Sequence, residues 1–113
     1  MHEMSIAQGI VSAVQDAVKG QQASRVEAVH LEVGGLSCVD THALEFGFQA
    51  VSKGTCLDGA VLKIEQPPGR AQCFGCGNEV PLQRLGDACP KCGSHQLVVI
   101  DGEQMRVKSM EVV

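Results

Sequence analysis

The chain has 113 residues, a formal net charge of −4 and 3% aromatic residues, which suits one ordinary domain or a small domain with a metal-stapled module. The acidic balance and the lack of Trp and Tyr argue against a protein that grips nucleic acid by phosphate contacts or base stacking. No run approaches the roughly 20 apolar residues of a membrane span, and the first residues carry no basic signal-peptide region. We therefore expect a cytoplasmic protein that binds neither nucleic acid nor membrane.

The first predicted element is an amphipathic helix from Met4 to Lys19. Ser5 is its expected N-cap, and Gly20 is the expected stop. Apolar residues recur there at steps of three and four, which is the period of one helix face. The members of this stripe are Ile6, Ala7, Ile10, Val11, Val14, Ala17 and Val18. We interpret the stripe as a core face.

A strand, a second helix and a second strand are predicted next. Alternating apolar residues end the run Arg25–Val33, which indicates a half-buried strand. Asp40 is the expected N-cap of a helix that extends to about Lys53, and residues 60–65 form a short strand before the linker Pro67–Pro68–Gly69. The residues expected to face inward from this helix are Ala43, Leu44, Gly47, Phe48 and Val51.

The last third of the chain predicts an insertion between strands. Residues 73–92 show no periodicity, so we expect a loop-rich segment that only a metal could organise. Residues 97–100 and 105–113 are rich in β-branched and apolar side chains, and the final run is expected to return to the first sheet. The predicted fold class is α+β: two helices packed on a small mixed β-sheet, with an inserted four-cysteine, zinc-ribbon-like module. The expected domains are residues 1–69 plus about 103–113, and residues 70–102.

Four of the six cysteines form two C-x-x-C pairs, Cys73/Cys76 and Cys89/Cys92, within CFGCGNEVPLQRLGDACPKCGSH. A glycine follows each pair, where a tight metal knuckle needs positive φ. Four thiolates in tetrahedral geometry suit structural Zn(II) and leave no open position for catalysis. A rubredoxin-like iron site remains an alternative. A thioredoxin-like dithiol fits poorly because neither pair opens a helix in a βαβ unit.

The remaining two cysteines, Cys38 and Cys56, stand apart in apolar-flanked segments. We interpret both as small buried hydrophobic residues rather than as reactive thiols.

The opening residues MHEMSIAQ carry a second set of metal donors. The Met1 amine, the amide and imidazole of His2 and the Glu3 amide lie in fused chelate rings, which Ni(II) and Cu(II) favour in square-planar sites. The Glu3 carboxylate could be a ligand or simply a favourable charge at a helix N-terminus. Local chemistry alone favours an ordinary solvated terminus over a nickel site.

A family resemblance joins these two donor sets. MHEMSIAQGIV, VEAVHLEVGGLSCVD, ALEFGFQAVSKGTCLDGAVLKIE and the two C-x-x-C-G knuckles occur in the order typical of the HypA/HybF family, and together they resemble it over essentially the whole chain. The resemblance implies a nickel metallochaperone for [NiFe] hydrogenase maturation, not an enzyme, and some members of the family also serve urease. It implies that Ni(II) is transient cargo bound by His2 with Glu3 adjacent, and that structural Zn(II) is held by Cys73, Cys76, Cys89 and Cys92.

The resemblance also implies partners. These are a nickel-handling maturation GTPase and the precursor of the [NiFe] hydrogenase large subunit, and a weak homodimer is allowed. Asp40 could reach the nickel site, although an N-cap is its simpler role. His95 could link zinc to nickel, although a surface position is its simpler role. The rival function is a zinc-ribbon interaction adaptor that carries no labile metal.

Overall fold

The computed structural model describes residues 3–20 and 25–113. Contacts divide this part of the chain into two compact units. One contains the described residues up to Leu31 together with Val39–Ile64 and Val107–Val113, and the other contains Glu32–Cys38 and Glu65–Arg106. Each unit is therefore assembled from segments that are distant in the sequence.

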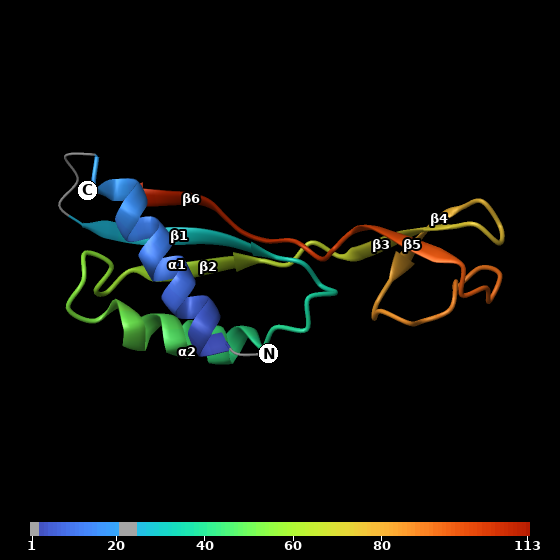
Figure 1. Ribbon diagram of the computed structural model, residues 1–113, viewed down its shortest axis with the longest axis horizontal. Helices are drawn as coiled ribbons and strands as arrows, with labels where there is room; N and C mark the ends of the chain where they lie inside the picture. The colour runs from blue at the N-terminus through green and yellow to red at the C-terminus, as the bar shows by residue number, and fades with distance from the viewer. Residues whose placement is uncertain (1–2, 21–24) are drawn as a thin grey trace. The chain divides into compact units, whose positions relative to one another are not determined.

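The sheet of the first unit has the strand order β2-β1-β6. Its strands are β1 (Val26–Val33), β2 (Val61–Glu65) and β6 (Met105–Val112). The arrows of β1 and β2 point the same way in Figure 1 and that of β6 points the opposite way, so the sheet is mixed. The predicted return of the last run to the first sheet is confirmed.

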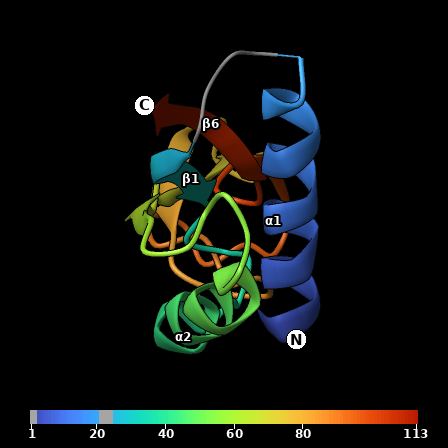
Figure 2. The same ribbon diagram turned by 90° about the vertical axis from the view of Figure 1, so that its left-hand side faces the viewer.

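Two helices, α1 (Glu3–Val18) and α2 (Thr41–Ser52), complete this unit. They lie beside each other, with α2 next to the N-terminal end of α1 (Figure 2). The core between the helices and the sheet is aliphatic with one aromatic ring, Phe48, which is fully buried. The largest of its other fully buried apolar side chains are Val14, Val26, Val29, Leu31, Leu44 and Leu57.

Helix α1 differs from its prediction in detail. It begins at Glu3, so Ser5 is an exposed residue of the first turn and not the N-cap. Ala17 is exposed, as is Ala43 in α2. Both lie at the margin of an apolar stripe, and the larger residues beside them bury the face without needing a methyl group there.

The second unit contains a sheet with strand order β4-β3-β5. Its strands are β3 (Gly69–Cys73), β4 (Glu79–Leu82) and β5 (Leu97–Asp101), and both pairings are antiparallel. Most of the segment between residues 73 and 92 lies outside helices and strands, but it also contains β4, which was not predicted from the sequence. Pro81 argues against a strand in the sequence, because proline has no N–H to donate within a sheet. Here the proline is tolerated because β4 is an edge strand, where the missing N–H is not needed.

Three closely packed contacts hold this sheet to the segment after β1. The Leu36 side chain belongs to the buried cluster of the unit, together with Ala71, Val80 and Leu82. The Leu36 amide donates to Gly102 O at 2.8 Å, and the Gly35 amide donates to Pro67 O at 2.8 Å. Gly69, assigned to a linker from sequence, is instead the first residue of β3, and a Cβ there would collide with Leu82 O and with Leu36.

Two phenylalanines on α2 give a matched test of the first unit. Phe48→Ala removes a fully buried ring, so we expect it to lower the free energy of unfolding by about 3–5 kcal/mol. Phe46→Ala changes a ring that is 73% exposed, so its effect should stay within about 0.5 kcal/mol. Urea unfolding followed by helical circular dichroism measures both. Equal losses in the two variants would contradict the described packing.

Candidate metal centre

The sulfur atoms of Cys73, Cys76, Cys89 and Cys92 all lie within 4.8 Å of one another. The separations are 3.6 Å between Cys73 and Cys92 and 3.8 Å between Cys76 and Cys89. A tetrahedral ion with Zn–S bonds of about 2.3 Å requires sulfur–sulfur edges of about 3.8 Å. The predicted four-cysteine cluster therefore forms, and its size fits zinc.

Two backbone knuckles with the same geometry aim these sulfurs. Gly77 has φ +77° and its amide donates to Cys73 O at 3.0 Å, while Gly93 has φ +78° and its amide donates to Cys89 O at 2.8 Å. This is the positive φ that the sequence predicted at both positions, a conformation that glycine adopts without steric cost.

Amide donors surround the sulfurs as they do around metal-bound thiolates. The Gly75 amide donates to Cys73 Sγ at 3.3 Å, and the Lys91 amide donates to Cys89 Sγ at 3.4 Å. The Asn78 side-chain amide donates to Cys76 Sγ at 3.4 Å. Hydrogen bonds of this kind favour the charged thiolate over the neutral thiol.

The pKa values of two of these thiols are shifted in opposite directions. Hydrogen bonds from the backbone and side chain of Asn78 lower the pKa of Cys76 to about 6. The Ser94 amide also acts to lower the pKa of Cys92, but desolvation and the three neighbouring sulfurs outweigh it and raise that pKa to about 12. Four thiolates so close together need a positive ion between them, and this is the donor set that zinc prefers.

The other cysteines and His95 lie outside this cluster. Cys38 is exposed, with φ +58°, so its interpretation as a buried hydrophobic residue is wrong. Cys56 is half-buried. His95 is exposed, and within the described residues it is not part of the metal-ligand group that the four cysteines form.

The nickel ligands predicted at the start of the chain are only partly described. Met1 and His2 lie outside the described residues. Glu3 is half-buried at the start of α1, and its carboxylate accepts a hydrogen bond from the backbone amide of Asp40 at 3.0 Å. That bond is the largest cause that lowers the pKa of Glu3, so the carboxylate is ionised near neutral pH.

Asp40 has the N-cap role that the sequence predicted. Its carboxylate accepts hydrogen bonds from the backbone amides of His42 at 3.0 Å and of Ala43 at 3.1 Å. The contact between Glu3 and Asp40 was not expected from sequence. No local pattern indicates it, because it joins residues 37 positions apart.

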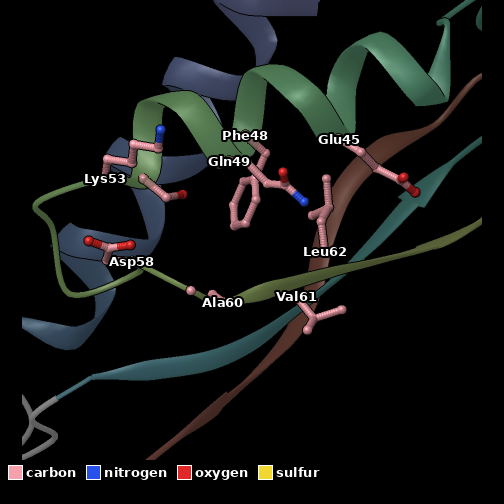
Figure 3. A pocket seen from close by; sticks show the side chains of 10 residues that line it. Glu45, Phe48, Gln49, Lys53, Asp58, Ala60, Val61 and Leu62 are labelled. Carbon is pink, nitrogen blue, oxygen red and sulfur yellow. The ribbon is translucent and has the colours of Figure 1, made fainter.

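A cavity of about 510 Å³ lies between α2 and β2, and none of the predicted metal ligands lines it. Figure 3 shows Phe48 and Leu62 at its apolar centre, with Glu45 at one end and Lys53 and Asp58 at the other. The Ser52 hydroxyl in its wall is buried, with no hydrogen-bond partner among the described residues. These side chains do not form a nucleophile–base pair.

Together, the fold and the site define a metal-handling protein with a closed four-thiolate centre. None of the described helices has both the length and the apolarity needed to cross a membrane.

Comparisons with known proteins also indicate a metal-handling protein. Residues 1–112 match the family model described as "Hydrogenase/urease nickel incorporation, metallochaperone, hypA". The chain is 47% identical over 112 residues to the hydrogenase maturation factor HypA of Azotobacter vinelandii and 49% identical over 112 residues to that of Alkalilimnicola ehrlichii, with 99% of each chain covered. The solution structure of the Ni metallochaperone HypA from Helicobacter pylori shares the fold, with 24% identity, a TM-score of 0.69 and coverage of 100% of this chain and 98% of that one. A second solution structure of a HypA protein has 25% identity and a TM-score of 0.72, covering 100% and 97%.

The chain belongs to the HypA family. The predicted family and function, a nickel metallochaperone of hydrogenase maturation, are confirmed. Nickel is the metal that the family description names, and the four-cysteine cluster fits the predicted zinc. As a hydrogenase maturation factor, the protein acts with the maturation machinery, to which the predicted partners belong.

Removal of one zinc-binding cysteine should unfold the second unit and leave the first unit folded. Cys73→Ala or Cys92→Ala should unfold the segment from about residue 70 to 96 and leave the helical signal of α1, because so small a core cannot stay folded without its ion. Zinc analysis and the amide NMR spectrum measure this. Cys38→Ala, which changes a cysteine outside the cluster, should keep both zinc and spectrum. Ordered signals of that segment in a Cys73→Ala protein treated with chelator would refute the structural-zinc assignment.

Proposed function

We propose that the N-terminus of this chain binds one Ni(II) ion through His2, with the Met1 amine and Glu3 as neighbouring donors, and releases it for [NiFe] hydrogenase maturation. Cys73, Cys76, Cys89 and Cys92 hold structural Zn(II) in the same proposal. The two metals are thus assigned to two different donor sets, nitrogen-rich for the cargo and sulfur-only for the structural ion.

The observation that carries this proposal is the completeness of the sulfur cluster. Within residues 3–20 and 25–113, the four cysteines are the single group of three or more His, Cys, Asp or Glu ligands that could hold a metal. Four thiolates at zinc spacing leave no vacant position for a second ion. Nickel cargo therefore needs donors elsewhere, and nitrogen donors of the kind found at the start of the chain are those that Ni(II) favours.

We assign the two metals to the two predicted domains. We assign nickel binding to residues 1–69 plus about 103–113 and zinc binding to residues 70–102. The proposed partners are a nickel-handling maturation GTPase and the precursor of the hydrogenase large subunit. Two copies of the chain are proposed to form a weak homodimer. Urease is proposed as a second enzyme that receives the nickel. Four thiols crowded into one module suit a reducing compartment, which supports a cytoplasmic location.

Nickel titration of untagged protein tests the proposal. His2→Ala should weaken nickel binding at least about 100-fold, because loss of even an outer-shell partner of a metal ligand costs about 10–100-fold. His95→Ala is the matched control, since this exposed histidine lies outside both proposed sites. It should change the dissociation constant less than about twofold, a shift well under 1.4 kcal/mol. Isothermal titration gives the affinities, and zinc content is followed in parallel.

Two results would contradict the proposal. Unchanged nickel binding in His2→Ala would leave the N-terminus without a metal role and favour the zinc-ribbon adaptor. Loss of nickel in His95→Ala alone would move the nickel site to the zinc module.

A further inference from the structure

The N-terminus of α2 is capped from two distant places in the sequence. A helix begins with backbone N–H groups that have no partner within the helix. Two of these, on His42 and Ala43, donate to the Asp40 carboxylate. The amide of Asp40 itself donates to Glu3 Oε2 at 3.0 Å. The last of these acceptors comes from α1.

This arrangement is a capping box with one residue replaced by a remote one. In a capping box the side chain at position N3 reaches back to the N-cap amide, and that residue is Glu or Gln. Position N3 of α2 is Ala43, whose methyl group cannot accept a hydrogen bond. Glu3, 37 positions earlier in the chain, supplies the missing acceptor.

The same carboxylate stands at the start of α1, because Glu3 is the first residue of that helix. It is therefore shared by the N-termini of two helices, both of which favour a negative charge. Its Oε2 atom is engaged by an amide donor, and a nickel ion would have to compete for that atom.

Packing just behind Glu3 is independent of this bond. A Cβ added to Gly47 of α2 would lie 3.4 Å from the Ala7 Cβ and 3.6 Å from the Met4 Sδ, so the first turns of α1 touch the middle of α2. Loss of the Glu3 carboxylate should therefore loosen only the start of α1 and leave the helix pair in place.

We propose that Glu3 is a positioning residue for nickel: its carboxylate completes the capping box of α2 and thereby holds the residues just before it for metal binding, while any Glu3 donor to nickel is its backbone nitrogen. This inference rests on the proposed N-terminal nickel site and specifies one residue of it. Holding the start of α1 before the metal arrives removes part of the chain-ordering entropy that binding would otherwise cost.

Two substitutions at Glu3 separate a positioning role from ligation by the carboxylate. Glutamine keeps an acceptor oxygen that serves in natural capping boxes, whereas alanine removes it. We expect Glu3→Gln to bind nickel within about threefold of the parent, and Glu3→Ala to bind about tenfold more weakly, the scale of a lost hydrogen bond to a charged group. Both should keep the parent's nickel absorption spectrum, because the metal's ligands are unchanged.

The hydrogen bond itself has a direct readout in nickel-free protein. The amide NMR signal of Asp40 should keep its hydrogen-bonded shift in Glu3→Gln and lose it in Glu3→Ala, with the other α2 signals retained. Glu45→Ala, an exposed acid on the same helix, is the matched control and should change neither the nickel affinity nor the Asp40 signal.

Three outcomes would overturn the proposal. Equal loss of affinity in Glu3→Gln and Glu3→Ala with an altered nickel spectrum would show that the carboxylate is a ligand. Parent-like nickel affinity in Glu3→Ala would show that the tether does not matter. An unshifted Asp40 amide in Glu3→Ala would show that the bond is absent. None of these touches the nickel site itself, which fails only if His2→Ala binds nickel normally.

Discussion

The convergence of four cysteine sulfurs within 4.8 Å is the constraint on which the second unit depends. Its buried cluster is small, consisting of Leu36, Ala71, Val80 and Leu82 with the thiols Cys73 and Cys89, and strand β3 ends at Cys73. So little apolar surface cannot offset the conformational entropy of ordering about fifty residues, roughly 1–2 kcal/mol each for the backbone. A metal ion that joins the two knuckles supplies the difference, which makes metal binding and folding of this unit one process.

The proposed assignment of the two metals to two different sets of donors has a chemical basis. A closed sulfur tetrahedron suits zinc and offers no open position. Nickel in a site of amine, amide and imidazole nitrogens has different donors and a different preferred geometry. Glu3 follows the proposed ligand His2 in the sequence, and its carboxylate accepts a hydrogen bond from the Asp40 amide. The proposed nickel site at the start of the chain involves few residues, so few would have to move when the cargo is released.

Sequence was sufficient wherever a local pattern decides the structure. The apolar period indicated both helices, Asp40 was recognisable as an N-cap, and Gly77 and Gly93 marked the knuckles. Strand β4 was missed because Pro81 is normally excluded from a sheet interior, and only the edge position of the strand makes it acceptable.

Contacts between distant segments could not be predicted in this way. The burial of Leu36 among the zinc-module residues and the hydrogen bond between Glu3 and Asp40 depend on tertiary packing, which leaves no periodic signal in one sequence. Cys38 is exposed and has φ +58°, neither of which its apolar neighbours in the sequence indicated.

The most direct test of two separate metal centres is X-ray absorption at the zinc and nickel edges of untagged protein loaded with one equivalent of nickel. The account predicts four sulfur neighbours at about 2.3 Å around zinc. It predicts only nitrogen and oxygen neighbours around nickel, with the zinc content unchanged. Sulfur in the nickel shell, or zinc released as nickel binds, would contradict it.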